Sequence, residues 1–366
     1  MEQADCVVIG AGVIGLAVAR RLAIAGRDVV VLERAATIGA ETSSRSSEVI
    51  HGGLYYPPAS LKARLCVAGR EALYRYCGEH GVGHARIGKL IVAATAEDEP
   101  ALARIAARAE ASGAGTLARL DAAGVRALEP EVRGTAALLS PRTGIVDSHG
   151  LMLAYLGDAE ARGTMVAYES PVTSGEVGEG GIVVAVGGAA PLRLRARTLV
   201  CCAGLDAPRV MASFAGFPVA CVPPRLLAKG SYFALSGRAP FARLIYPVPG
   251  PTGLGIHAAL DLAGRCRFGP DVEWVERVDY AVDPARAERF YAAIRRYWPG
   301  LPADALDPAY AGIRPKVARG GADVDFVVQG PRSHGIPGLV ALYGIDSPGL
   351  TASLALAEHV AGLLGT

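Results

Sequence analysis

Three glycines and one acidic residue near the start of the chain have the types and the spacing that bind a dinucleotide. Gly10, Gly12 and Gly15 directly follow a β-branched run, and Glu33 ends a second apolar run. In such a unit the glycines allow a tight turn, a close approach of the backbone to a pyrophosphate and close packing of helix on strand. The acid, about 20 residues further on, accepts hydrogen bonds from ribose hydroxyls. The sequence therefore predicts a dinucleotide site with its phosphates at a helix N-terminus.

A segment rich in small and hydroxyl residues follows this acid. Residues 39–56, here named the cradle loop, contain four serines, one threonine and three glycines. Such a composition packs poorly in a core but lets backbone and hydroxyl groups surround a ligand. The loop also holds His51, and histidine is the side chain that titrates nearest to neutral pH. The loop is therefore a candidate ligand site, and His51 a candidate general base.

Hydrophobic periodicity predicts the elements that must position these groups. A strand at residues 6–9, a helix at 16–25 and a strand at 28–32 complete the dinucleotide unit. Alternating patterns with glycine turns favour antiparallel strands before a strand at 198–203. The other expected elements are helices at residues 61–80, 97–112, 122–128, 148–162 and 284–297, a strand at 164–169, and a last helix from Gly349 to Leu364.

Length, charge and cysteine usage limit the class of protein. At 366 residues the chain exceeds the roughly 250–300 at which one core stops growing, so two domains are expected. A formal net charge of +2 is too small for a nucleic-acid partner. Seven cysteines without a Cys-x-x-Cys pair disfavour zinc and disulfide frameworks and favour buried thiols in a reducing compartment. No uncharged run reaches the roughly 18–20 residues that span a bilayer.

The cradle loop resembles the loop of the D-amino-acid-oxidase-like flavoproteins that runs past the FAD pyrophosphate to the isoalloxazine ring. Residues 49–56 (Val-Ile-His-Gly-Gly-Leu-Tyr-Tyr) and their continuation to Cys66 resemble one branch most closely, the L-2-hydroxyglutarate dehydrogenase/oxidase family. Glycerol-3-phosphate dehydrogenases share the Ile-His-Gly-Gly-Leu core but not the Tyr-Tyr followed by Ser-Leu-Lys-Ala. Further segments similar to that family, in the same order, are residues 88–93, 199–204, 244–249, 255–257, 268–270, 311–315, 325–326 and 344–353.

This resemblance implies an α/β fold with a discontinuous Rossmann-type FAD-binding domain and a second, mixed or antiparallel-sheet substrate domain. The FAD-binding domain is expected at residues 1–86, 143–216 and 310–366, and the substrate domain at 87–142 and 217–309. No recognisable flavinylation motif is present, so non-covalent FAD is expected. The implied cofactor ligands are Gly10, Gly12, Gly15, Glu33, Arg34, Thr42, Ser43, Ser44, Arg45, Ser46, Gly52, Val172, Ala203, Gly204, Arg314, Ser347, Pro348, Gly349, Leu350 and Thr351.

The resemblance also implies a reaction, the FAD-dependent oxidation of an L-2-hydroxy acid, with L-2-hydroxyglutarate to 2-oxoglutarate as the first expectation. His51 is the expected base for the hydroxyl proton, and His257 is the alternative base or a substrate ligand. Arg314 is expected to bind a carboxylate through its planar fork. The residues expected at the far end of the substrate are Tyr55, Lys62 and Tyr246.

Two other functions stay open at this point. One is an amino-acid or glycerol-3-phosphate oxidoreductase of the same superfamily, and the other is a non-catalytic flavin-binding subunit. The electron acceptor, oxygen or a quinone, is not encoded in a motif. The expected location is the cytoplasm, either free or peripheral at the inner face of the membrane. Departures from the family are Ser47-Glu48 in place of Ser-Gly, Ala259 in place of threonine, and a short stretch between Trp274 and Arg314.

Overall fold

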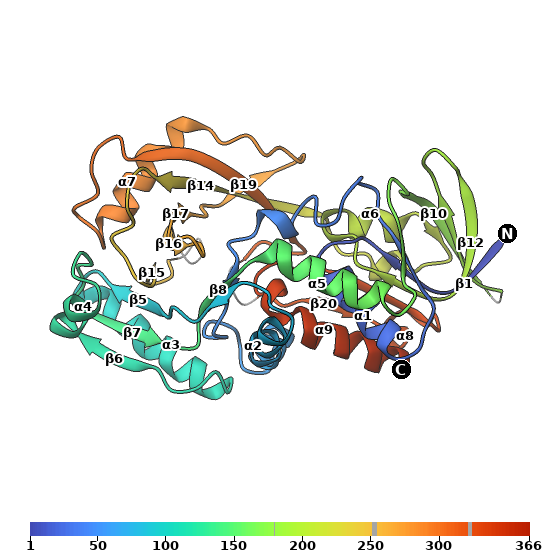
Figure 1. Cartoon of the computed structure of the whole chain (residues 1–366), viewed down its shortest axis with the longest axis horizontal. Coiled ribbons are helices and arrows are strands. Elements are labelled where there is room, and N and C mark those ends of the chain that lie inside the picture. Colours follow the sequence, from blue (N-terminus) through green and yellow to red (C-terminus); the bar gives the residue numbers. More distant parts are fainter. Residues whose placement is uncertain (179, 251–254, 321–323) are drawn as a thin grey trace.

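The computed structural model describes residues 1–178, 180–250, 255–320 and 324–366. These residues form two nine-stranded sheets and one small three-stranded sheet. The two large sheets lie toward opposite ends of the molecule (Figure 1). Each is assembled from segments far apart in the sequence, so the chain crosses between them repeatedly. The predicted fold class, α/β with a discontinuous Rossmann-type domain and a second mixed-sheet domain, is confirmed.

The first large sheet has a parallel core and an antiparallel flank. Its strands are β1 (Glu2–Ile9), β2 (Val29–Leu32), β9 (Met165–Ala167), β10 (Val172–Gly178), β11 (Gly181–Val186), β12 (Leu192–Cys201), β13 (Phe214–Ala215), β20 (Val327–Gln329) and β21 (Leu339–Tyr343). β12 pairs in parallel with β1 on one side and, through its last residues, with β21 on the other. Its first residues pair instead with the antiparallel meander β10–β11. β2 and β9 extend the parallel part beyond β1.

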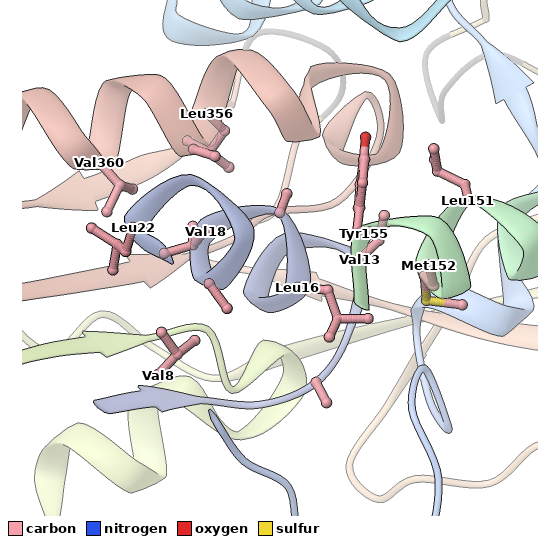
Figure 2. Close-up of a cluster of buried hydrophobic side chains, with 14 of the residues drawn as sticks. Val8, Val13, Leu16, Val18, Leu22, Leu151, Met152, Tyr155, Leu356 and Val360 are labelled. Carbon is pink, nitrogen blue, oxygen red and sulfur yellow. The ribbon is translucent and has the colours of Figure 1, made fainter. Parts of the chain in front are cut away.

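Helices cover this sheet and form the core of the domain. α1 (Val13–Ile24) packs between the sheet and two later helices, α5 (Ser148–Glu160) and α9 (Gly349–Leu364). Figure 2 shows side chains of α1, among them Leu16, lying between side chains of β1, α5 and α9. α1 ends where Gly26 adopts a φ of +78°, a left-handed conformation that glycine reaches without steric cost.

The start of the second helix is fixed from a distant part of the chain. α2 (Leu61–Glu79) packs against α9, and the hydroxyl of Ser60 accepts a hydrogen bond from the third amide of its first turn. The carboxylate of Asp325 accepts hydrogen bonds from the first two amides, at 2.7 and 2.9 Å. Both caps satisfy amides that a helix leaves without partners. The shorter helices of this domain are α6 (Ala207–Ala212) and α8 (Pro331–His334).

The second large sheet carries the other face of the site. Its strands are β5 (Lys89–Ala93), β6 (Ala118–Asp121), β7 (Ala136–Ser140), β14 (Leu226–Leu235), β15 (Leu244–Pro247), β16 (His257–Leu260), β17 (Cys266–Gly269), β18 (Glu273–Val275) and β19 (Leu306–Lys316). Its helices are α3 (Glu99–Ala111), α4 (Ala122–Leu128) and α7 (Ala287–Arg295). β5 and β15 pair in parallel, and the other pairings are antiparallel. The register brings Tyr246 between Ile91 and His257 in one row across the sheet.

The small sheet, β3 (Val49–Ile50), β4 (His84–Ala85) and β8 (Gly144–Val146), includes two residues of the cradle loop. The predicted helices all exist, with ends that differ by up to three residues; residues 284–286, for example, form a 3-10 turn before α7. The predicted domain division stays a prediction, and its boundary at residues 309 and 310 falls within β19. All seven cysteines are free. Among the described residues, no helix combines the length and the apolar character needed to cross a bilayer.

The contact between α1 and the turn before it yields a first prediction. A Cβ at Gly15 would lie 1.9 Å from the carbonyl oxygen of Gly10, a backbone atom that cannot move aside. We expect Gly15→Ala to lower the free energy of unfolding in urea by about 3 kcal/mol. The matched control is Gly157→Ala in α5, where a Cβ would meet nothing within 4 Å. This control should stabilise by up to about 1 kcal/mol, and equal effects of the two changes would contradict the packing argument.

Candidate active site

One deep cavity of about 1640 Å³ lies between the two large sheets and is lined from both. It is larger than the roughly 300–1,000 Å³ of a site for a drug-sized ligand. Its walls include the ends of β1, β2 and β12 with the cradle loop on one side, and parts of β16 and β19 on the other. The cavity therefore has room for an elongated ligand that runs from the first sheet to the second.

The dinucleotide end of the cavity is shaped by the glycine turn and by Glu33. Gly10 has a φ of +99°, and a Cβ there would lie 2.7 Å from the carbonyl oxygen of Cys202. The carboxylate of Glu33 accepts hydrogen bonds from the amides of Ala11, at 2.7 Å, and Ala35, at 2.8 Å. These bonds hold the carboxylate at the cavity wall, and its oxygens keep lone pairs for ribose hydroxyls.

The N-terminus of α1 opens into the same cavity. Gly12 is its N-cap and offers no side chain, and the hydroxyl of Ser43 accepts a hydrogen bond from the amide of Val13 at 3.0 Å. A Cβ at Gly12 would lie 3.0 Å from that hydroxyl. Free amides and the positive end of the helix dipole favour an anion here, so the site fits a pyrophosphate.

The cradle loop is bonded to β19 of the second sheet. The hydroxyl of Thr42 donates to the carbonyl of Ile313, and Arg45 donates to the carbonyl of Ala311, both at 3.3 Å. The Tyr310 hydroxyl donates to the carbonyl of Ser46 at 2.9 Å. The cradle loop thus lines the end of the cavity where the cofactor is expected. The same loop is hydrogen-bonded to β19, which lines the opposite end of the cavity.

Most of the predicted cofactor ligands line the cavity. Arg34 is one of these lining residues, and its guanidinium forms ion pairs with the carboxylates of Glu41 and Asp206. The others at the wall are Gly10, Gly12, Glu33, Thr42, Ser43, Arg45, Ser46, Val172, Ala203, Gly204, Arg314, Ser347, Pro348, Gly349 and Leu350. Gly15, Ser44, Gly52 and Thr351 are not among the lining residues. None of these roles has been tested, and each stays a prediction.

His257 lies on the wall that β16 contributes. Its ring stacks on Tyr246 with centroids 3.8 Å apart, and Nδ1 lies 3.2 Å from the carbonyl oxygen of Gly255. A carbonyl only accepts, so Nδ1 carries the proton and Nε2 presents a lone pair. Within the described part of the chain, Nε2 is buried without a hydrogen-bond partner. Burial, and then the charge of Lys89, lower the pKa of His257 to about 3, so the ring is neutral.

His51 is held more tightly than His257. The hydroxyl of Thr351 accepts a hydrogen bond from the His51 amide at 2.9 Å, and it donates to the carbonyl of Val49 at 3.2 Å. The ring Nε2 lies 3.0 Å from the hydroxyl of Ser347, just before α9. Burial and then Lys89 lower the pKa of His51 to about 3, against the opposite effect of Asp346. The structure thus places both candidate bases at one cavity, and they differ in how their nitrogens are engaged.

Arg314 reaches the cavity from β19 with only carbonyl partners. Its Nη2 donates to the carbonyl of Asp271 at 3.0 Å, and its Nε donates to that of Ala228 at 3.4 Å. No carboxylate among the described residues forms an ion pair with it. Its charge is close enough to His257 to lower the pKa of that ring. The guanidinium is therefore oriented by the protein and retains charge for an anionic ligand.

Lys62, predicted at the far end of the substrate, forms part of a buried ion-pair triad. Its ammonium lies 2.8 Å from one oxygen of Asp346, and that of Lys316 lies 2.5 Å from the other. Burial raises the pKa of Asp346, but the two ammonium groups outweigh it and the pKa is lowered. All three residues line the cavity. Neither Asp346 nor Lys316 was identified as a site residue from the sequence. The scarcity of lysine could have drawn attention to Lys316, because the chain has only four lysines among 37 basic residues.

The departures from the family pattern are compensated locally. Glu48 has a φ of +57°, which explains why a glycine suits this position. Its carboxylate pairs with Arg267 of β17 at 2.7 Å and accepts a hydrogen bond from the Ser148 hydroxyl at 2.8 Å. Ala259 is fully buried and lies beside Arg267 in the sheet. The larger residue at position 48 thus adds a contact between the cradle loop and the second sheet.

Comparisons with known proteins agree with this geometry. The family profile described as FAD dependent oxidoreductase (DAO) matches residues 5–363. The chain is 42% identical to the mitochondrial L-2-hydroxyglutarate dehydrogenase of Arabidopsis thaliana, an alignment that covers 98% of this chain and 83% of the relative. It is 32% identical to the L-2-hydroxyglutarate dehydrogenase of Salmonella houtenae over 73% of this chain and 63% of that protein.

Solved structures share the fold. The FAD-bound L-α-glycerophosphate oxidase of Mycoplasma pneumoniae superposes with a TM-score of 0.90 at 23% identity, covering 100% of this chain and 96% of the other. The glycine oxidase of Geobacillus kaustophilus gives a TM-score of 0.82 at 19% identity, with coverages of 100% and 95%. At these identities the likeness concerns the fold alone.

The position of Glu33 yields a second prediction. Glu33→Gln keeps the shape of the side chain but replaces one carboxylate oxygen by an NH2 group. This group cannot accept a hydrogen bond from a backbone amide or from a ribose hydroxyl. We expect the dissociation constant for FAD to rise about 10- to 100-fold, measured by flavin fluorescence after dilution. Glu160→Gln, at the exposed end of α5, is the control. Equal FAD retention by the two variants would remove Glu33 from the site.

Proposed function

The chain belongs to the DAO family of FAD-dependent oxidoreductases. We propose that it oxidises an L-2-hydroxy acid and that L-2-hydroxyglutarate is the main candidate substrate. One observation carries the proposal: among the residues that the structure describes, a neutral histidine whose buried Nε2 has no hydrogen-bond partner faces the same cavity as an arginine that has no acidic partner. A hydroxy acid needs both groups, a base for its hydroxyl proton and a cation for its carboxylate. The names of the two aligned relatives support the choice of substrate.

The roles of the residues follow from their hydrogen bonds. Arg314 binds the carboxylate beside the reacting carbon, and its two carbonyl contacts fix the direction of the guanidinium. The His257 Nε2 takes the hydroxyl proton, while Gly255 and Tyr246 hold the ring. FAD, when bound, accepts the hydride from the same carbon, so the substrate leaves as a 2-oxo acid. His51, engaged with Ser347, orients the wall next to α9.

The N-terminus of α9 supports the cofactor end of the reaction. Gly349 and Leu350 line the cavity at the start of this 16-residue helix. The positive end of its dipole favours negative charge nearby, which suits the reduced flavin ring. Non-covalent attachment of FAD, oxygen or a quinone as electron acceptor, and contact with a membrane surface all stay predictions.

The substrate is tested by anaerobic reduction of the purified holoprotein. L-2-Hydroxyglutarate should bleach the flavin absorbance, while its D-enantiomer, a panel of amino acids and glycerol 3-phosphate should leave the colour unchanged. Faster bleaching by an amino acid or by glycerol 3-phosphate would replace the proposed substrate by that compound. A stable colour with every compound would favour a flavin-binding subunit without turnover.

The choice between the two histidines is tested in single-turnover flavin reduction. His257→Gln should slow reduction by about 10²- to 10⁴-fold, the usual contribution of a general base. His51→Gln should cost less than about tenfold, because Nε2 of His51 is already engaged with Ser347. Both variants should keep FAD, which its absorbance verifies. The reverse order of the two effects would assign the base to His51.

A further inference from the structure

Lys89 is a buried lysine with no counter-ion among the residues that the structure describes. Its exposed fraction is 0%, and Nζ has no hydrogen-bond partner among the described residues. The ammonium lies 4.4 Å from the ring centroid of Tyr246 and 4.7 Å from that of Tyr55. An isolated buried ammonium is costly, and aromatic faces offset only part of that cost. A bound ligand is therefore expected to supply the partner that the ammonium of Lys89 lacks.

Each of the other three lysines of the chain forms an ion pair with a carboxylate. Lys62 and Lys316 share the carboxylate of Asp346, and Lys229 lies 3.1 Å from the carboxylate of Asp279. These three and Lys89 are all the lysines that the chain has. Lys89 is thus the exception among four lysines with buried or nearly buried side chains.

Two hydroxyl groups in front of Lys89 also lack partners. The hydroxyls of Tyr55 and Tyr246 are buried without a hydrogen bond in the described structure, and both residues line the cavity. Burial raises the pKa of both tyrosines, and Tyr55 raises that of Tyr246 further, so both stay protonated and able to donate. Lys89 itself does not line the cavity, whereas both of the rings that its ammonium contacts do.

We propose that Lys89 is a positioning residue that acts through Tyr55 and Tyr246 to bind a second carboxylate of the substrate, at the end away from Arg314. An ammonium over the face of a phenol ring draws electron density from the ring and strengthens its hydroxyl as a donor. Two such donors in a cavity of low dielectric, with a positive charge behind them, match a carboxylate. The inference rests on the proposed oxidation of L-2-hydroxyglutarate and adds to it the residues that recognise the second carboxylate of that substrate.

The electrostatics of the cavity agree with this assignment. Burial lowers the pKa of Lys89 to about 7, as expected for an ammonium that lacks an anion. A carboxylate against the two hydroxyls supplies that anion and favours the charged amine. The charge of Lys89 also lowers the pKa of His51 and His257, so it lies within electrostatic reach of both candidate bases. The second carboxylate would thus lie in the same cavity as the reacting carbon.

The test compares Lys89→Met with Lys229→Met, a control that removes a buried amine from the same large sheet. Lys229 does not line the cavity, although its neighbours in β14 do. Glutarate binding to each holoprotein is measured by calorimetry, and anaerobic flavin reduction is measured with L-2-hydroxyglutarate and with the monocarboxylate L-2-hydroxybutyrate. Lys89→Met should weaken glutarate and L-2-hydroxyglutarate binding about 10- to 100-fold. L-2-Hydroxybutyrate binding should stay within about threefold, and any change in the limiting reduction rate, through the effect of Lys89 on the pKa of the two histidines, should be the same for both substrates. Equal losses for both substrates, or an unchanged preference, would overturn the proposal.

Two further measurements guard against a folding defect. Lys89→Arg keeps the charge and should restore most of the preference for the dicarboxylate. The double variant Tyr55→Phe/Tyr246→Phe should weaken dicarboxylate binding by itself, and adding Lys89→Met to it should have little further effect, because coupled residues are not additive. Full additivity refutes the role, and a tyrosine variant with unchanged preference refutes it even if Lys89→Met fails to fold. If Lys89→Met weakens glutarate binding but no hydroxy acid reduces the flavin of the parent, the proposed function fails and the subsite stands.

Discussion

The close approach of backbone to backbone at the glycine turn is the constraint on which the other features depend. A side chain at Gly10 would strike the end of β12, and one at Gly15 would strike Gly10 itself. Only without these atoms do β1, α1 and β12 meet closely enough for their ends to form one wall of a cavity. Glu33 then ties this wall to the end of β2 through two backbone amides. The cofactor end of the site is therefore set by main-chain geometry.

The substrate end is set by side chains that cross from one sheet to the other. Thr351 connects α9 with Val49 and His51 of the cradle loop through one hydroxyl. Glu48 connects the same loop with Arg267 of the second sheet. These bonds are few but buried or half-buried, where their geometry is well defined and their loss leaves polar groups unpaired. Such contacts join the cradle loop both to α9 and to the second large sheet.

The sequence predicted the parts of the site that depend on local order along the chain. The glycine spacing identified the turn and Glu33, and helical periodicity gave α2 and α9 nearly to the residue. Neither Lys89 nor the His257 Nε2, which has no hydrogen-bond partner in the described structure, was predicted. Both depend on the register between β5, β15 and β16, and β5 lies far from the other two strands in the sequence. The engagement of Lys62 by Asp346 is likewise a contact over 284 positions. A scarcity of lysine was the signal that could have drawn attention to both lysines.

The bonds between the cradle loop and β19 have a consequence for the order in which ligands bind. Thr42, Arg45 and Ser46 lie where the cofactor is expected, and each is hydrogen-bonded to the strand that carries Arg314. Anything that orders the loop also orders the arginine, and two sites linked in this way must influence each other's affinity equally. FAD would then act as a structural effector as well as an oxidant: the apoprotein should bind the acid more weakly than the holoprotein does, and the acid should in turn tighten the binding of FAD.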